Sequence, residues 1–166
     1  MPALKRGDKD YFPLYVGNYI LGGGGFVSRL TEEVREKKGL VYSVYSYFMP
    51  LYAEGPLEIG LQTKKEQADE ALTIVNSTIK KFIDDGPTEK ELIAAKQNLV
   101  GGFPLRLDSN AKIVDYLSMI AFYNLPISYI DTYIQEINKV TISQIKTAFK
   151  NKIDPNKLTT IIVGAE

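Results

Sequence analysis

The sequence contains neither cysteine nor histidine. The absence of cysteine excludes disulfides, thiolate nucleophiles and thiolate metal ligands. The absence of histidine excludes imidazole general bases, serine–histidine triads and histidine-ligated zinc. Any chemistry within the chain would therefore depend on carboxylates, lysine, tyrosine or arginine. We do not expect the chain to be a catalyst on its own.

Net charge and long apolar runs are also absent. Twenty basic residues balance twenty acidic residues, so we expect neither nucleic acid nor an anionic membrane as a partner. No apolar run approaches the roughly 18 residues of a membrane helix, and no charged-then-apolar leader opens the chain. We therefore expect neither a membrane span nor a secretion signal.

Length and composition fit one globular domain. The chain has 166 residues, of which 45% are hydrophobic and 24% are charged. A chain of this length can bury roughly 70% of the surface that it exposes when unfolded. We expect a single domain over residues 1–166, in which residues 1–8 form an irregular edge.

The first part of the chain predicts two helices. Apolar residues at helical spacing indicate a helix over residues 9–21, which Asp8 can cap. Ser28 is a candidate N-cap for a second helix, which continues to about Lys38. Gly39 follows at the position where a left-handed residue ends many helices.

Two strands are predicted next. Residues 40–48 are rich in β-branched and aromatic residues, and residues 57–63 alternate apolar with polar or small side chains. A turn around residues 52–55 joins the two runs. We expect a half-buried antiparallel hairpin.

The second half of the chain is mostly helical, with one closing strand. Apolar stripes predict helices over residues 68–83, 92–103, 113–121, 130–137 and 145–149. Capping-box sequences precede two of them, Thr88-Glu-Lys-Glu91 and Thr141-Ile-Ser-Gln144. Residues 158–163 are apolar enough to form a strand in the centre of a sheet. Few strands and many helices predict an α+β fold, a two-layer sandwich in which several helices pack on one face of a mixed or antiparallel sheet.

The run Gly22, Gly23, Gly24 and Gly25 first invites a phosphate-binding interpretation. However, no Lys-Ser/Thr pair follows it, and its spacing is not that of G-x-G-x-x-G. The N-terminus of the next helix could still attract an anion or a carbonyl oxygen. The alternative is structural, because four glycines can form a sharp turn between helices with positive φ angles.

Arg35 and Tyr42 are the candidate functional side chains. Each has an ordinary explanation, since a cation favours the last turn of a helix and a tyrosine packs well in a strand. Gly39 reverses the chain between them, so the end of the helix and the start of the strand should meet at one corner. A guanidinium and a phenol there would present fixed hydrogen-bond donors to a peptide carbonyl or to its oxyanion.

Several motifs resemble one family. Leu-Gly-Gly-Gly-Gly-Phe from Leu21, Ser-Arg-Leu from Ser28 and Glu-x-x-Arg-Glu-Lys-x-Gly-Leu-x-Tyr from Glu32 resemble the second domain of the pitrilysin/insulinase-type zinc peptidases, which include the mitochondrial processing peptidases. Later segments resemble the same domain, and the resemblance extends from about Gly7 almost to the end of the chain. These segments are residues 88–96, 103–108, 123–129 and 161–164.

The resemblance implies a division of labour between domains. In this family an inverted His-x-x-Glu-His motif in the first domain holds zinc. The second domain supplies an arginine and a tyrosine that grip the substrate backbone, and Arg35 and Tyr42 match that pair in type and spacing. Gly22 to Gly25 match the position of a longer glycine-rich substrate loop in a non-catalytic processing-peptidase subunit. The chain itself is expected to hold no cofactor, and zinc is implied for the complete peptidase.

The resemblance also implies partners. The chain would be the C-terminal domain of a longer peptidase half, or part of a half that never bound zinc. Its expected partners are a preceding homologous domain that carries or replaces the zinc site, a second peptidase half in a homo- or heterodimer, and a peptide substrate. A bacterial protein of the periplasm or cytoplasm is implied.

Two functions are alternatives to a substrate-binding peptidase domain. One is a scaffold subunit of the same fold, and the other is an anion- or nucleotide-binding module built on the glycines.

Overall fold

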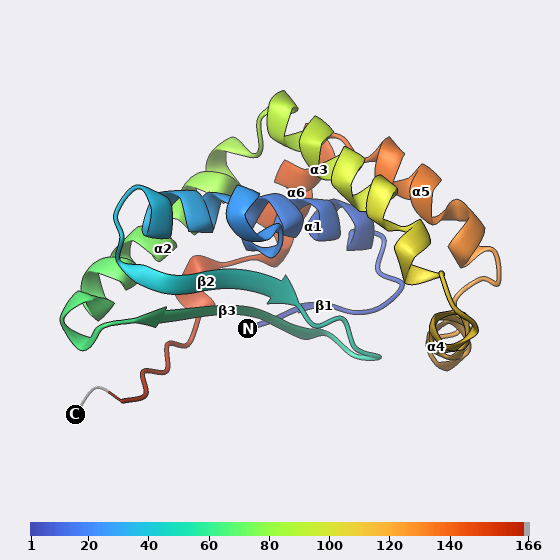
Figure 1. The fold of residues 1–166 in the computed structure, drawn as a ribbon, viewed down its shortest axis with the longest axis horizontal. Helices are drawn as coiled ribbons and strands as arrows, with labels where there is room; N and C mark the ends of the chain where they lie inside the picture. Colours follow the sequence, from blue (N-terminus) through green and yellow to red (C-terminus); the bar gives the residue numbers. More distant parts are fainter. Residues whose placement is uncertain (165–166) are drawn as a thin grey trace.

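The computed structural model describes residues 1–164, which form a layer of helices over one face of a three-stranded sheet (Figure 1). The strands are β1 (Pro2–Leu4), β2 (Val41–Phe48) and β3 (Gly55–Thr63), in the order β1-β3-β2. The helices are α1 (Tyr11–Asn18), α2 (Ala68–Asp85), α3 (Glu89–Gly102), α4 (Asn110–Phe122), α5 (Tyr129–Lys139) and α6 (Ile142–Lys152). This arrangement confirms the predicted α+β class and the two layers.

The antiparallel hairpin of β2 and β3 is also confirmed. Val44 pairs with Leu61, and Phe48 pairs with Leu57 at the other end of the ladder. Alternate side chains of β3 face the helices, and Leu57 among them is buried. The alternation of apolar with polar or small residues in this segment thus correctly indicated which face of the strand the helices cover.

Both capping boxes form as predicted. Thr88 accepts a hydrogen bond from the backbone N–H of Glu91, whose carboxylate accepts one from the backbone N–H of Thr88. Thr141 and Gln144 make the same reciprocal pair at the start of α6. These motifs succeed as predictors because their partners lie three residues apart.

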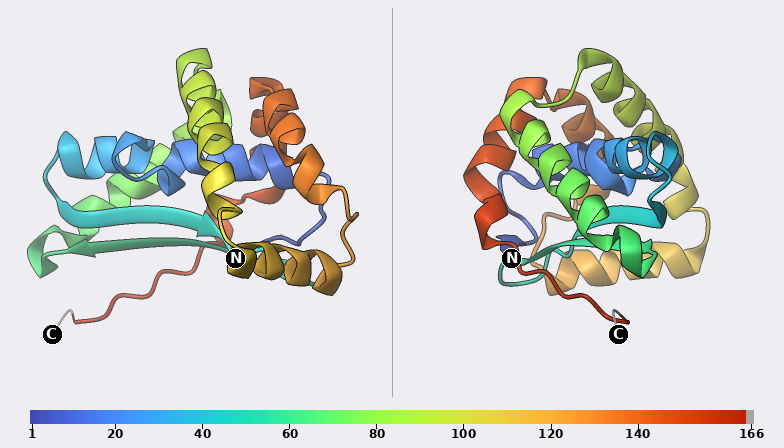
Figure 2. Two further views of the ribbon diagram at one scale, coloured as in Figure 1. Left: turned by 45° about the vertical axis from the view of Figure 1, so that its right-hand side comes forward. Right: turned by 90° about the vertical axis from the view of Figure 1, so that its left-hand side faces the viewer.

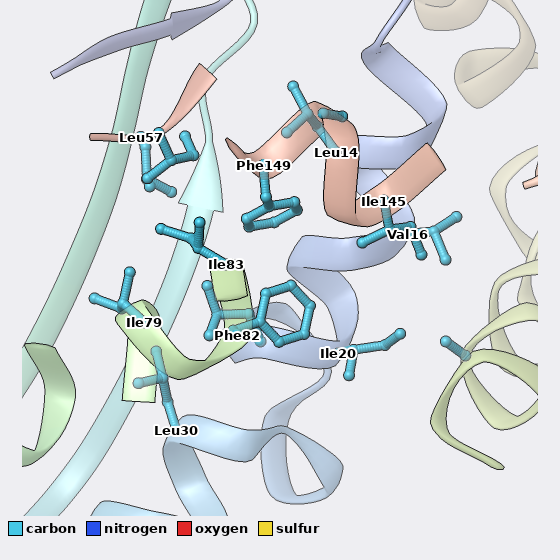
Figure 3. Close-up of a cluster of buried hydrophobic side chains, with 14 of the residues drawn as sticks. Leu14, Val16, Ile20, Leu30, Leu57, Ile79, Phe82, Ile83, Ile145 and Phe149 are labelled. Carbon is cyan, nitrogen blue, oxygen red and sulfur yellow. The ribbon is translucent and has the colours of Figure 1, made fainter. Parts of the chain in front are cut away.

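The helices meet the sheet around two phenylalanines. Phe82 of α2 and Phe149 of α6 pack edge to face, with ring centroids 4.9 Å apart, and both are fully buried. Phe149 also lies against Phe48 of β2, with the centroids 6.1 Å apart. Figure 3 shows Phe82 and Phe149 together with buried side chains that α1 and β3 contribute, among them Leu14 and Leu57.

The two helices predicted near the start of the chain are present, but most of the second is wound as a π-helix. A π-helical turn, η1 (Tyr19–Gly23), continues α1, and a second π-helical segment, η3 (Thr31–Glu36), follows after a short 3₁₀ turn. Ser28 has the extended conformation expected of an N-cap. Its hydroxyl, however, donates to the carbonyl oxygen of Gly25 instead of accepting from a helix N–H.

The two ends of the chain differ from the prediction. Residues 2–4, where no element was expected, form β1 against β3, and Ala3 and Leu4 are buried. The strand predicted over residues 158–163 is wrong, because this segment runs extended without pairing and leaves Ile161 82% exposed. Apolar character alone does not make a strand, since a strand needs a neighbour to accept its backbone hydrogen bonds.

The periphery of the helical layer is looser. Helix α4 lies at the end of the sheet away from α2, as Figure 1 and the left view of Figure 2 show, and of its side chains only that of Ile120 is buried. Among the residues that the structure describes, no helix is both long enough and apolar enough to cross a membrane.

One ion pair joins the N-terminal third of the fold to α3. The guanidinium of Arg29 donates to both carboxylate oxygens of Glu91, at 2.6 and 2.7 Å, and to the carbonyl oxygen of Gly86 at 3.0 Å. The same guanidinium lies over the ring of Phe82. Burial alone would raise the pKa of Glu91, but hydrogen bonds from Arg29 and Thr88 outweigh it and lower that pKa to about 2.

This pair makes folding stability depend on acid pH. Because the pKa of Glu91 is lower in the folded chain than its ordinary value of 4.5, its contribution is complete above that value and is lost as the pH falls toward 2. We expect Glu91→Gln to lower the free energy of unfolding by about 1–2 kcal/mol at pH 7, because the pair is partly exposed. The difference from wild type should vanish near the lower pH, as urea titrations at several pH values can measure.

A matched control is Glu136→Gln, which removes the more exposed ion pair of Glu136 with Lys139. Exposed pairs contribute little, so this variant should differ from wild type by less than about 0.5 kcal/mol at every pH. An equal and pH-independent loss in both variants would contradict the role assigned to Glu91.

Candidate functional site

The candidate site is the corner at which η3 ends and β2 begins. Gly39 has a φ of +62°, the left-handed conformation expected at a helix end. Its N–H donates to the carbonyl oxygen of Arg35 at 2.8 Å, and the N–H of Leu40 donates to that of Val34 at 3.1 Å. These two bonds close the helix and turn the chain directly into the strand.

Buried neighbours turn Arg35 and Tyr42 outward. Val34 is fully buried before Arg35, and Val41 is buried before Tyr42. The Arg35 side chain keeps 34% of its surface exposed, and Tyr42 is 79% exposed. The corner therefore presents a guanidinium and a phenol to solvent from a backbone that is anchored in the core.

Arg35 is held by an aromatic ring. Its guanidinium lies 4.8 Å from the ring centroid of Phe26 and makes a long ion pair with Glu36 at 4.0 Å. Phe26 directly follows Gly25, so this stack brings the end of the glycine run to Arg35. Within residues 1–164, no hydrogen bond or cation–π contact joins Arg35 to Tyr42, which share the corner only through the backbone.

The four glycines have different surroundings. Gly22 is buried, and a Cβ there would collide with the hydroxyl and the backbone nitrogen of Ser46 on β2. Gly23 and Gly24 approach the preceding helical turn closely, whereas Gly25 has a φ of +62° and open space around it. Of the four, Gly25 alone has the positive φ that the structural interpretation expected, whereas Gly22 to Gly24 are glycines because neighbouring atoms leave no room for a Cβ. Gly23 to Gly25 are the glycines that reach the surface.

Two buried polar residues fix the glycine run against β2. The side-chain amide of Asn18 donates to the backbone carbonyl of Ser46 at 3.0 Å, and the Ser46 hydroxyl donates back to Asn18 at 2.7 Å. The sequence alone did not predict this pair. Its signal was faint, because Ser46 is only a small polar residue within a strand that also buries Val44.

The corner offers donors to a ligand rather than metal ligands. A guanidinium and a phenol can donate hydrogen bonds to carbonyl oxygen, whereas zinc sites use histidine, cysteine or carboxylates. Within residues 1–164, no three acidic side chains lie close enough to hold a metal ion. The carboxylates of Glu32 and Glu33 in η3 are paired with Lys37, at 3.0 and 2.8 Å.

Comparison with known proteins places the chain among peptidase domains. A family model described as the peptidase M16 inactive domain matches residues 1–99. The chain is 34% identical over 146 residues to "Non-peptidase homolog YmxG" of Helicobacter pylori, covering 86% of this chain and 33% of the relative. It is 38% identical over 112 residues to "Uncharacterized zinc protease YmxG" of Bacillus subtilis, covering 67% of this chain and 27% of the relative. The chain thus spans a third or less of the length of these relatives.

Solved structures agree with the sequence relatives. The chain superposes with a TM-score of 0.88 on the crystal structure of a peptidase M16 inactive domain from Pseudomonas fluorescens, at 42% sequence identity, covering 94% of this chain and 37% of that one. A protease from Helicobacter pylori shares the fold, with a TM-score of 0.83 at 20% identity over 93% of this chain and 37% of the other.

The packing of Gly22 gives a testable consequence. We expect Gly22→Ala to lower the free energy of unfolding by about 1–3 kcal/mol, because the new methyl group would push β2 away from the end of α1. Gly101→Ala is the matched control. It lies within α3 with no atom near the added Cβ, so it should raise stability by up to about 1 kcal/mol. Thermal and urea unfolding can measure both effects, and equal stability of the two variants would contradict the packing argument.

Proposed function

This chain belongs to the peptidase M16 family, in which it matches the inactive domain, and from that premise we propose that it grips the backbone of a peptide substrate. In the longer protein it completes an active site whose zinc motif lies in another domain or subunit. The observation that carries the proposal is the corner of η3 and β2. There Arg35 and Tyr42 face solvent from an anchored backbone.

The chemistry of the two side chains supports a role at a peptide carbonyl. The guanidinium of Arg35 presents a planar set of N–H donors, and the hydroxyl of Tyr42 supplies one more. Stacking on Phe26 restricts the guanidinium, so part of the ordering entropy is lost before a ligand arrives. A guanidinium restricted in this way can stabilise negative charge as it develops on oxygen during acyl transfer.

The residues of this chain do not fit a zinc ion. The sequence has no histidine or cysteine, and its described carboxylates form no cluster that could hold a metal. When bound elsewhere in a complete peptidase, zinc polarises the carbonyl and activates water. The share of this chain in the proposal is to bind and orient the peptide backbone.

The partners follow from the length of the relatives. Because the chain spans a third or less of them, we expect a preceding homologous domain that carries or replaces the zinc site. We also expect a second peptidase half, with which this half forms a homo- or heterodimer. The relatives reported above are bacterial, and we expect this protein to act in the periplasm or cytoplasm of a bacterium. Gly23 to Gly25 are the part of the glycine run that could contact the peptide beside Arg35.

A second candidate function is a scaffold of the same fold. It is favoured by the Helicobacter pylori relative, which is 34% identical and is named a non-peptidase homolog. A scaffold would need the buried contacts of this domain but not the exposed donors of Arg35 and Tyr42. Loss of those donors should therefore impair a peptide-gripping domain but not a scaffold.

The proposal predicts the effect of removing each donor. In the complete peptidase, Tyr42→Phe and Arg35→Ala should each lower kcat/KM by about 10²–10³, because each removes a donor aimed at backbone oxygen. Arg35→Lys should not restore full activity, since a point charge cannot replace the planar guanidinium. The fold and the zinc content should stay unchanged, as circular dichroism and metal analysis can verify.

Two substitutions at other exposed positions serve as controls. Tyr45→Phe removes a phenol from the same strand, and Lys38→Ala removes a cation near the same helix end. Both should retain wild-type kcat/KM. Unchanged activity of the Arg35→Ala, Tyr42→Phe double variant, assayed below saturation, would refute the gripping role and leave the scaffold function.

A further inference from the structure

A long groove lies along β3 on the side away from β2. Its volume is about 780 Å³, and its two walls are β3 from Leu57 to Thr63 and the unpaired segment of residues 158–164. Helix α2 forms its floor. Figures 1 and 2 show the terminal segment as an extended trace beyond β3, opposite β2.

The wall formed by β3 has unused backbone groups. The N–H of Leu57 donates to the carbonyl oxygen of Met1 at 3.0 Å, which places Met1 opposite Leu57. Within residues 1–164, β1 is the only strand on this edge, and its pairing ends there. Because N–H groups alternate in direction along a strand, those of Ile59 and Leu61 point into the groove, whereas those of Glu58 and Gly60 point to β2.

The floor is apolar and suits alternating side chains. Leu72, Val75 and Ile79 of α2 line it, on the same side of the sheet as Leu57 and Ile59. A strand placed beside β3 would direct every second side chain onto these residues. The groove thus offers backbone hydrogen bonds along one wall and apolar burial at its base.

The other wall is a strand-forming sequence without a partner. Residues 158–163 are rich in β-branched residues and run extended, yet Ile161 and Val163 are 82% and 91% exposed. A strand in the groove would lie between this segment and β3. Residues 158–163 would then have a neighbouring strand to pair with. They form no strand in this chain because that neighbour is absent.

We propose that the groove is the seat of one extended strand, antiparallel to β3 and supplied by the backbone that continues upstream of Met1 in a longer protein. The direction of β1 supports this occupant, because Met1 lines the end of the groove. A chain that continues β1 upstream of Met1 would run along β3 from Leu57 toward Thr63. The length of the relatives supports it too, since this chain covers 33% and 27% of them. The inserted strand extends β1 along β3 and pairs the part of β3 beyond Leu57, which within residues 1–164 has β2 as its only neighbouring strand.

The register of the inserted strand follows from the pairing of Met1 with Leu57. In an antiparallel pair, each step forward along one strand is matched by one step backward along the other. The second and fourth residues upstream of Met1 therefore lie opposite Ile59 and Leu61. Their side chains face α2 and should be apolar. The fifth upstream residue lies opposite Gln62 and faces away from the helices.

Amide hydrogen exchange tests the occupancy. In the longer protein, the amides of Ile59 and Leu61 should exchange at least about 100-fold more slowly than in a chain that begins at Met1. The amides of Glu58 and Gly60 are internal controls, since they bond to β2 and should be protected in both proteins. Equal exchange of Ile59 and Leu61 in the two proteins would overturn the proposal.

A disulfide tests the register and the source of the strand. This chain has no cysteine, so once any cysteine upstream of Met1 is replaced by serine, Gln62→Cys combined with a cysteine at the fifth upstream residue can form only one intramolecular bridge. Facing residues of a non-hydrogen-bonded pair lie close enough for that bond, whereas a cysteine at the fourth upstream residue faces the opposite side. We expect an oxidised monomer for the first pair and free thiols for the second.

The remaining outcomes contradict the proposal. An oxidised dimer on a non-reducing gel would show that a second copy fills the groove. Free thiols for both pairs, together with unprotected Ile59 and Leu61 amides, would show that no upstream strand enters it. Equal oxidation of both pairs would overturn the register, because adjacent residues of a strand point to opposite faces.

Discussion

The close approach of the glycine run to β2 is the contact on which the candidate site depends. Gly22 lies where any side chain would collide with Ser46, and the buried Asn18–Ser46 hydrogen bonds lock the end of α1 to the same strand. With the start of η3 placed in this way, Phe26 can lie under Arg35, and Gly39 can return the chain into β2. A loss of this packing would move the corner without touching either candidate residue.

The sequence predicted the features that depend on interactions between residues close together in the chain. The capping boxes of Thr88 and Thr141 and the alternation of β3 depend on near neighbours, so those helices and the hairpin were predicted correctly. The left-handed Gly39 was found for the same reason. Such signals carry their own partners within a few residues.

Features that depend on distant partners were missed. Residues 158–163 have the composition of a strand but no neighbour to pair with, and β1 exists because residues far along the chain offer it an edge. The Arg29–Glu91 ion pair and the Asn18–Ser46 pair join residues 62 and 28 positions apart. Of the candidate site, the sequence predicted the corner at Gly39 that brings the ends of η3 and β2 together, but not the contact of Arg35 with the ring of Phe26.

The account describes a domain that contributes hydrogen-bond donors and no metal ligand, so its central claim concerns what Arg35 and Tyr42 touch. The most direct measurement is a crystal structure of the longer protein with an uncleavable peptide bound. The account predicts that the Arg35 guanidinium and the Tyr42 hydroxyl lie about 2.7–3.1 Å from backbone oxygens of the peptide. A bound peptide that leaves both side chains in solvent would contradict it.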